Sequence, residues 1–394
     1  LGQISIGRIF QGSVHPGDTV SLMKSGGGIF HHRVEKVFIF RGLERLEVPE
    51  ARAGDIVAIA GVDNVSIGET IAAQDDPEAL PSIEIVEPTV KMTFGVNTSP
   101  MMGREGTHCT SRVLYDRLMR ELRTNVSLRV ETTASPDIFL VSGRGELHLS
   151  ILVETMRREQ FEFQVSRPEP VTKIVDGRVH EPYEHLTITT REEFIGALTE
   201  YLSGRLAQLI DMKYDGSGNA TMDYKIPTRG LIGFSSFFLR TTRGDGVKSS
   251  VFLEYAPMEG QLKATASGVL VASEPGVSVT YGLLNAQGRG STFIAPGTKV
   301  YQGMIIGMHP REGDIAMNVC KEKKLTNMRS STADVAKRLN AQVKMSLEDS
   351  LDFISTDELV EVTPLSIRMR KKDLTAEDRA RRRRNNAPGA VGSR

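Results

Sequence analysis

Several residue types and patterns are scarce or missing in this 394-residue sequence. It has no tryptophan and only two cysteines, Cys109 and Cys320, which are too few for a disulfide framework or a four-cysteine zinc site. No apolar run approaches the ~18 residues that a membrane-spanning helix needs. We therefore expect a globular protein of the reducing cytoplasm, without a membrane partner.

Motifs that carry catalytic chemistry are also missing. No Gly-x4-Gly-Lys-Ser/Thr sequence is present to cradle nucleotide phosphates, and no Gly-x-Ser-x-Gly elbow presents a nucleophile. The adjacent His108 and Cys109 supply too few ligands for zinc. Glu146 and His148 lie two residues apart in an expected helix and point to different faces, so they do not form an acid–base pair. We predict no catalytic residue, metal or cofactor in this chain.

The formal net charge of zero hides an uneven distribution. Residues 1–256 hold 28 basic and 34 acidic residues, whereas residues 257–394 hold 21 and 15. Residues 321–344 carry seven basic and two acidic side chains, 345–367 carry six acidic and no basic ones, and 368–384 carry nine basic and three acidic ones. Blocks of like charge indicate a surface that meets an anionic partner.

The order of expected elements predicts four domains and a multidomain α+β fold. Short β-prone runs separated by turns such as Pro16-Gly17-Asp18 predict a small β-barrel over residues 1–82. Residues 83–168 alternate in the ferredoxin-like order βαββαβ, and residues 169–256 repeat it. Residues 257–394 predict a mainly β domain with short helices and a disordered basic tail.

Helix periodicity and capping patterns give predictions at single residues. Apolar positions at helical spacing are expected in the two ferredoxin-like cores: Leu114, Leu118, Leu147, Ile151, Phe194 and Leu198. Capping boxes are expected to begin helices at Thr190, Ser346 and Thr375. In the second ferredoxin-like domain we expect the segment "SSFFLRTT" to be a strand.

Three segments resemble translational GTPases, in the order in which those proteins carry them. The segment "SGRGELHLSILVETMRRE" resembles the signature of the third domain of elongation factor G, with a match at Ser142, Gly143, Gly145, Glu146, Leu147, His148 and Leu149. Residues 1–82, with "GRIFQGSVHPGDTV", resemble the second-domain barrel of the same superfamily, without its first strand. The segment "HEPYEHLTITTREEFIGALTEYLSGR" resembles the fifth domain of elongation factor G.

The C-terminal part distinguishes among members of that superfamily. No long fourth domain separates residues 83–168 from 169–256, and "KKLTNMR" and "DELVEVTPLSIRMRKKDLTAEDRAR" resemble the C-terminal domain of the BipA/TypA GTPases. The resemblance implies a monomeric fragment of a ribosome-binding GTPase whose missing domain uses GTP and Mg²⁺. It also implies roles in large-subunit assembly and stress adaptation, with ribosomal RNA and the acceptor end of A-site tRNA as partners.

Basic and hydroxyl-bearing residues in this C-terminal part are the predicted RNA contacts, because such side chains meet phosphate oxygens. The predicted set is Lys321, Lys323, Lys324, Thr326, Asn327, Arg329, Ser330, Arg368, Arg370, Lys371 and Lys372. A second set is possible: Arg229, Arg240, Arg243, Lys248 and Arg289. Two alternatives stay open at this stage, namely a LepA-like GTPase fragment and a protein-interaction scaffold that uses the acidic block 345–367.

Overall fold

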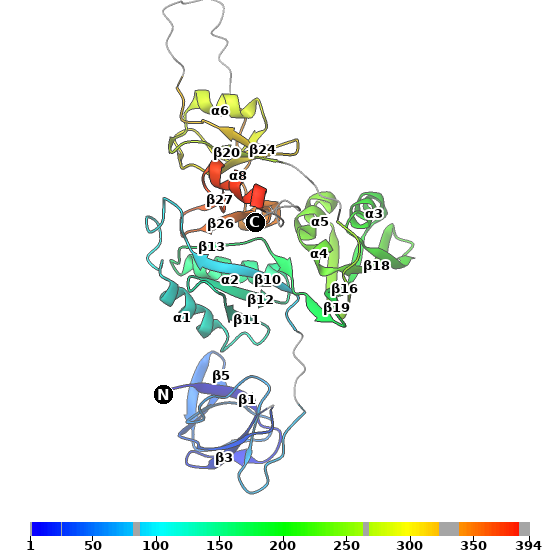
Figure 1. The fold of residues 1–394 in the computed structure, drawn as a ribbon. Coiled ribbons are helices and arrows are strands. Elements are labelled where there is room, and N and C mark those ends of the chain that lie inside the picture. The colour runs from blue at the N-terminus through cyan, green and yellow to red at the C-terminus, as the bar shows by residue number, and fades with distance from the viewer. Residues whose placement is uncertain (1, 25, 82–86, 263–267, 323–338, 386–394) are drawn as a thin grey trace, which may run out of the picture. The chain divides into compact units, whose positions relative to one another are not determined.

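The computed structural model describes most of the chain (Figure 1). The described residues are 2–24, 26–81, 87–262, 268–322 and 339–385. Contacts divide the chain into two units, Leu1–Ile85 and Val86–Arg394, with the short segment Arg123–Val126 grouped with the first unit. Within the described residues, no helix has both the length and the apolar character needed to cross a membrane.

The first unit is the expected small β-barrel, made of short antiparallel sheets around one apolar core. One sheet has the order β1(Ile4–Arg8), β8(Ile56–Ala60), β5(Lys36–Arg41) and β6(Glu44–Val48), and another has β4(Ile29–Arg33), β3(Thr19–Met23) and β9(Thr70–Ala73). A third pair joins β2(Ser13–Val14) and β7(Ala51–Arg52). Leu22, Val37 and Val57 lie in the core. The turn before β3 needs Gly17 at φ 97°, a value that glycine adopts without steric cost.

The second unit begins with a ferredoxin-like domain, as predicted. Its elements are β10(Val90–Val96), α1(Ser111–Glu121), β11(Arg129–Thr132), β12(Ile138–Gly143), α2(Glu146–Arg158) and β13(Phe163–Val165). Its strands lie in the order β11-β12-β10-β13, and all are antiparallel (Figure 1). Leu114 and Leu118 of α1 are buried as expected.

Helix α2 corrects part of the predicted core. Leu147 and Ile151 are 64% and 57% exposed, so their prediction as core residues is wrong. The buried stripe instead runs through Leu149, Val153 and Met156, at helical spacing. Leu147 and Ile151 lie four residues apart on the opposite face of the helix.

A second ferredoxin-like domain follows. Its main elements are β16(Arg178–Arg191), α3(Ile195–Ser203), β17(Gln208–Tyr214), β18(Asn219–Pro227), α4(Thr228–Leu231), α5(Phe234–Thr242) and β19(Gly246–Pro257). The strand order β17-β18-β16-β19 repeats that of the first domain, with the short β15(Lys173–Val175) beside β16. Leu198 is fully buried, whereas Phe194 is only half-buried.

Two local predictions in this domain are wrong. The segment "SSFFLRTT" is helix α5 and not a strand, because Phe234, Phe238 and Thr242 are buried at four-residue spacing, which suits one face of a helix. Thr190 forms no capping box. Its hydroxyl donates to the backbone carbonyl of Asp245 at 3.2 Å, and Arg191 occupies the cap position of the short 3₁₀ turn Glu192–Phe194.

The C-terminal part first forms a small sheet of its own. Its strands are β22(Ser291–Thr292), β24(Ile305–His309), β20(Gly268–Ala272) and β25(Ile315–Met317), in that order. Strand β25 is parallel to β20, and the other pairs are antiparallel. Helix α6(Thr280–Gln287) packs beside this sheet, and β21(Gly276–Val277) pairs with β23(Lys299–Val300).

The chain then returns to the first ferredoxin-like domain. Ser346 caps helix α7(Leu347–Phe353) with the complete predicted capping box. Before α8(Ala376–Asn385), the hydroxyl of Thr375 accepts a hydrogen bond from the backbone N–H of Asp378 at 3.1 Å, which is one of the two bonds of the box predicted there. Between them, β26(Glu358–Val362) pairs with β13, and β27(Ile367–Lys371) pairs with β26. The resulting sheet has the order β11-β12-β10-β13-β26-β27. Residues 358–371 therefore share a sheet and a core with residues 83–168, although the sequence pattern predicts separate domains for them.

Candidate nucleic-acid interface

Three of the predicted RNA contacts lie on β27, where Arg370 and Lys371 are buried and Arg368 is half-buried. Arg370 is 2% exposed, and its guanidinium donates to Thr98 Oγ1 at 2.7 Å and to Gln164 Oε1. Arg368 is paired with Glu105 and lies 4.0 Å from Glu361. Burial lowers the pKa of Arg370, in keeping with its removal from water.

Lys371 is held by three carboxylates. It is 2% exposed, and its Nζ lies 2.7 Å from Glu358, 2.8 Å from Asp314 and 3.1 Å from Asp357. Burial alone would lower the pKa of Lys371, but these carboxylates raise it overall. In this conformation Arg370 and Lys371 are buried, Arg368 is half-buried, and all three side chains contact groups of the protein, which argues against their prediction as RNA contacts.

Arg229 is a similar case in the second ferredoxin-like domain. Its Nε lies 2.7 Å from a carboxylate oxygen of the fully buried Glu181, and its Nη2 donates to the backbone carbonyl of Glu259 at 2.6 Å. Burial raises the pKa of Glu181, although Arg229 acts in the opposite direction. Arg229 therefore connects β16 to the segment that follows β19, which argues against a contact with RNA.

Most of the remaining predicted residues are either exposed or lie outside the described part of the chain. Lys321, Lys372, Arg243 and Arg289 are exposed. Arg240 is also exposed, with Asp349 at 3.7 Å, whereas Lys248 is half-buried and lies above the ring of Phe234. The others lie outside the described residues: Lys323, Lys324, Thr326, Asn327, Arg329 and Ser330.

Helix α8 carries basic residues that the predicted contact set does not include. Arg381, Arg382 and Arg384 are exposed, and Arg382 also pairs with Asp373 at 2.9 Å. Arg379 is half-buried, and its Nη1 donates to the backbone carbonyls of Asp373 and Leu374 at 3.0 and 2.8 Å. The sequence signal is the run "RARRRR", which lies in a basic block but also resembles the start of a disordered tail.

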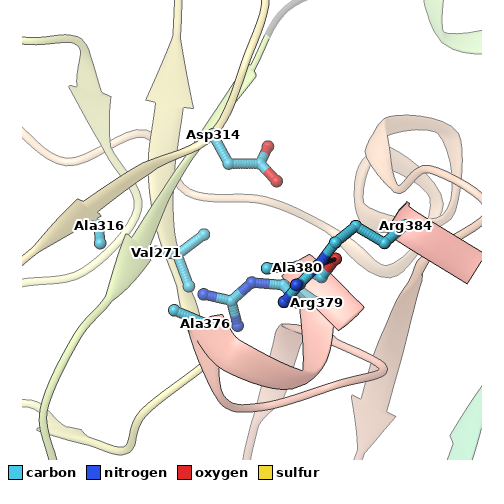
Figure 2. Close-up of a pocket in the computed structure, with 7 residues that line it drawn as sticks. All are labelled: Val271, Asp314, Ala316, Ala376, Arg379, Ala380 and Arg384. Carbon is cyan, nitrogen blue, oxygen red and sulfur yellow. Dashed lines mark hydrogen bonds between the residues drawn. The ribbon is translucent and has the colours of Figure 1, made fainter. Parts of the chain in front are cut away.

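A cavity of about 390 Å³ lies between α8 and the strands β20 and β25 (Figure 2). Its apolar lining comes from Val271 and Ala316 on the strands and from Ala376 and Ala380 on the helix. Ala376 and Ala380 are four residues apart and therefore lie on one face of α8.

The charged rim of this cavity comes from Arg379, Arg384 and Asp314 (Figure 2). Asp314 also pairs with Lys371, so the cavity borders the buried network of β27. A guanidinium group is planar and presents several N–H donors to phosphate oxygens, which suits this rim to an anion. Among the described residues no group of three or more His, Cys, Asp or Glu side chains is placed to hold a metal ion.

Comparison with known families covers three parts of the chain. Residues 2–72 match the family profile "Elongation factor Tu domain 2", and residues 178–266 match "Elongation factor G C-terminus". Residues 267–376 match "TypA/BipA C-terminal domain". The order of these matches follows the order of domains described above.

Curated relatives match almost the whole chain. A protein of Synechocystis sp. named "Large ribosomal subunit assembly factor BipA" is 52% identical over 371 residues, which is 94% of this chain and 62% of the relative. Proteins of the same name from Bacillus subtilis and Escherichia coli are 47% identical over 96% and 98% of this chain. The chain spans 62–64% of the length of these relatives. With this identity and its TypA/BipA C-terminal domain, the chain belongs to the TypA/BipA family of elongation-factor-like proteins.

Proposed function

We propose that this chain is the ribosome-binding part of a BipA-type translational GTPase and that it contacts ribosomal RNA through its C-terminal basic surface. The relatives' name, a large ribosomal subunit assembly factor, supports the ribosome as partner. In this proposal, a domain outside these residues binds GTP and Mg²⁺ and hydrolyses GTP on the ribosome. The acceptor end of a bound tRNA is a further contact of the same surface.

The observation that carries this proposal is the exposed guanidinium face of α8. Arg381, Arg382 and Arg384 project from the last turns of a helix whose first turn holds Glu377 and Asp378. Glu377 and Asp378 lie four residues before Arg381 and Arg382, whereas no acidic residue lies three or four positions before Arg384 on the helix. Arginine at this density attracts and fixes phosphate groups, while the lack of aromatic residues on α8 favours contact with the RNA backbone over base stacking.

The exposed Lys372 and Lys321 extend this basic surface in the proposal. We include residues 323–330 in the proposed contact set from their sequence alone, because it is rich in lysine, arginine and hydroxyl groups. The matched TypA/BipA C-terminal domain favours this interpretation over a LepA-like factor.

The scaffold alternative depends on a free acidic surface at residues 345–367, and the structure does not favour it. Glu358 and Glu361 are 2% and 0% exposed, and the carboxylate of Asp349 completes the capping box of helix α7. Asp357 pairs with Lys371. Most of the acidic block is therefore engaged inside the protein and is not available to recruit a basic partner.

The test is co-sedimentation of the 394-residue chain with purified large ribosomal subunits over a series of salt concentrations. Changing Arg381, Arg382 and Arg384 together to Glu should weaken binding and reduce the slope of log K against log salt by roughly 0.7–0.9 for each phosphate that the protein no longer neutralises. The matched control changes the same residues to Lys, which keeps the charge and should keep the slope. Equal affinity and slope for the Glu variant and the unchanged protein would refute the proposed surface.

A further inference from the structure

The start of helix α5 is capped by a side chain from another domain. A helix N-terminus leaves backbone N–H groups without partners, and no side chain at the cap of α5 itself supplies one. Instead Glu146, in the first turn of α2, accepts a hydrogen bond from the backbone N–H of Gly233 at 3.0 Å. Its other carboxylate oxygen accepts one from Ser235 Oγ at 3.1 Å. The first and second ferredoxin-like domains are therefore joined at this point.

A second carboxyl group reaches the same helix end from the C-terminal part. Asp352 of α7 accepts a hydrogen bond from Ser236 Oγ at 2.7 Å. A Cβ atom added to Gly233 would lie 3.5 Å from Cγ of Asp352, so this carboxyl also lies against the cap residue. Three segments far apart in the sequence, on α2, α5 and α7, thus meet around two carboxyl groups.

The surroundings of these carboxyls do not neutralise them fully. Glu146 faces Asp352 on α7 and, with an opposite effect, Lys248 on β19. Asp352 is flanked by Asp349 on its own helix, while Arg240 of α5 and Arg205, which precedes β17, act in the opposite direction. Arg240 is largely exposed and lies near Asp349, so its charge is partly engaged elsewhere.

Both carboxyls consequently resist ionisation. Burial raises the pKa of Glu146 to about 7, and the neighbouring Asp352 adds to the increase, while the hydrogen bonds from Gly233 and Ser235 act against it. Burial likewise raises the pKa of Asp352, and Asp349 adds to it. Two carboxylates in one site repel each other, which is the usual reason that one of them keeps its proton.

We propose that Glu146 and Asp352 form a proton-sensitive latch that ties the second ferredoxin-like domain to the first and to helix α7. The latch is closed while the pair holds a proton and loosens when both carboxyls are ionised. This inference does not depend on the ribosome proposal, because it concerns contacts within the chain.

The direction and size of the effect follow from proton linkage. A carboxyl whose pKa is raised in the closed state stabilises that state fully below its ordinary value of 4.5, and this stabilisation is lost as the pH rises through about 7. If the pKa of Glu146 returns to 4.5 when the latch opens, the open fraction should rise about tenfold between pH 6 and pH 8. The rise ends above this range, because both states are ionised there.

The test is hydrogen–deuterium exchange of the peptide that contains Gly233 and Ser235, measured from pH 5 to pH 9 and corrected for the intrinsic exchange rate at each pH. The backbone N–H of Gly233 donates directly to Glu146, so its protection reports the latch. In the unchanged protein the corrected exchange should rise about tenfold between pH 6 and pH 8. The variant Glu146→Gln keeps an accepting oxygen but cannot ionise, and it should show no such rise.

The matched control is Glu154→Gln on the same helix, where Glu154 pairs with Arg157 and Arg158 and not with α5. It should keep the full pH dependence. If Glu146→Gln does not fold, the variant Asp352→Asn provides the test of the proposal. Removing the repelling charge of Asp352 should lower the pKa of Glu146, so the rise in corrected exchange should occur at lower pH. An unchanged midpoint pH of that rise would overturn the proposal. A flat profile in the unchanged protein, or a rise in Glu146→Gln equal to that of the unchanged protein, would overturn it as well.

Discussion

Strand β27 and helix α8 are both rich in basic residues and follow each other in the chain, yet their side chains have opposite surroundings. Arg370 and Lys371 on β27 are each 2% exposed and contact acceptors on other elements. Arg381 and Arg384 on α8 are exposed to solvent. The difference shows that local charge density does not decide whether a basic residue meets a partner outside the molecule.

Whether a basic side chain is exposed depends on whether the fold places hydrogen-bond acceptors or carboxylates next to it. In the β26–β27 hairpin, Glu358 stands opposite Lys371 and Glu361 opposite Arg368, so part of the acidic block is aligned with part of the basic block. Opposite charges directly across a strand pair stabilise the pairing. On α8, Arg382 pairs with Asp373, whereas Arg381 and Arg384 stay exposed to an incoming anion.

The largest effect that this comparison predicts is at Lys371, with the adjacent Lys372 as control. Changing Lys371 to Met leaves the buried Glu358 without its cation, and we expect a loss of about 3–5 kcal/mol in the free energy of unfolding. Changing the exposed Lys372 to Met should alter it by less than ~0.5 kcal/mol. Urea denaturation followed by circular dichroism measures both. Equal losses in the free energy of unfolding would show that Lys371 and Lys372 do not differ in burial and pairing as the structure indicates.

The features that could be predicted from the sequence are those that depend on near neighbours in the chain. Leu114 and Leu118 lie at helical spacing, and Ser346 caps α7 by accepting a hydrogen bond from the backbone N–H of Asp349, three residues later. Both features were therefore predictable. The burial of Arg370 was not, because its partners Gln164 and Thr98 lie 206 and 272 residues away. The capping of α5 by Glu146 could not be predicted for the same reason, because Gly233 lies 87 positions after Glu146 in the sequence.

Helix identity and helix phase were the other sources of error. The segment "SSFFLRTT" contains Phe238 but not Phe234, which directly precedes it. The helical spacing of the buried residues Phe234 and Phe238 is therefore visible only when the residue before the segment is included. On α2 a stripe through Leu147 and Ile151 is as regular as the stripe through Leu149 and Val153. The choice between two such stripes depends on which one packs against the sheet, and the local sequence pattern does not indicate this.

The same contrast between buried and exposed neighbours can be tested with apolar residues on α2. Leu149 is 0% exposed and Leu147 is 64% exposed. Leu149→Ala should cost ~2–5 kcal/mol in unfolding free energy, since it removes packed methyl groups from the core. Leu147→Ala should change it by less than ~0.5 kcal/mol. Urea denaturation of the two variants measures this difference, and a larger effect for Leu147→Ala would reverse the assigned face of the helix.

The smallest expected effects distinguish two arginines of α8, one held within the fold and one at its exposed end. Arg379 donates to the backbone carbonyls of Asp373 and Leu374, so Arg379→Ala leaves those acceptors without a donor and should cost about 1–2 kcal/mol. Arg384 lines the cavity and is exposed, and its Nε makes a 3.4 Å contact with the carbonyl of Ala380. Arg384→Ala should therefore leave the unfolding free energy unchanged within ~0.5 kcal/mol.

Binding to large ribosomal subunits should follow a different order for these two variants. If Arg384 neutralises one phosphate, Arg384→Ala should reduce the slope of log K against log salt by roughly 0.7–0.9. Arg379→Ala should weaken binding only as far as it loosens the start of α8, without a change of slope of that size. Both quantities come from the same protein preparations, by urea denaturation and by co-sedimentation in a salt series. A slope that falls for Arg379→Ala and not for Arg384→Ala would mean that the start of α8, and not its exposed end, faces the RNA.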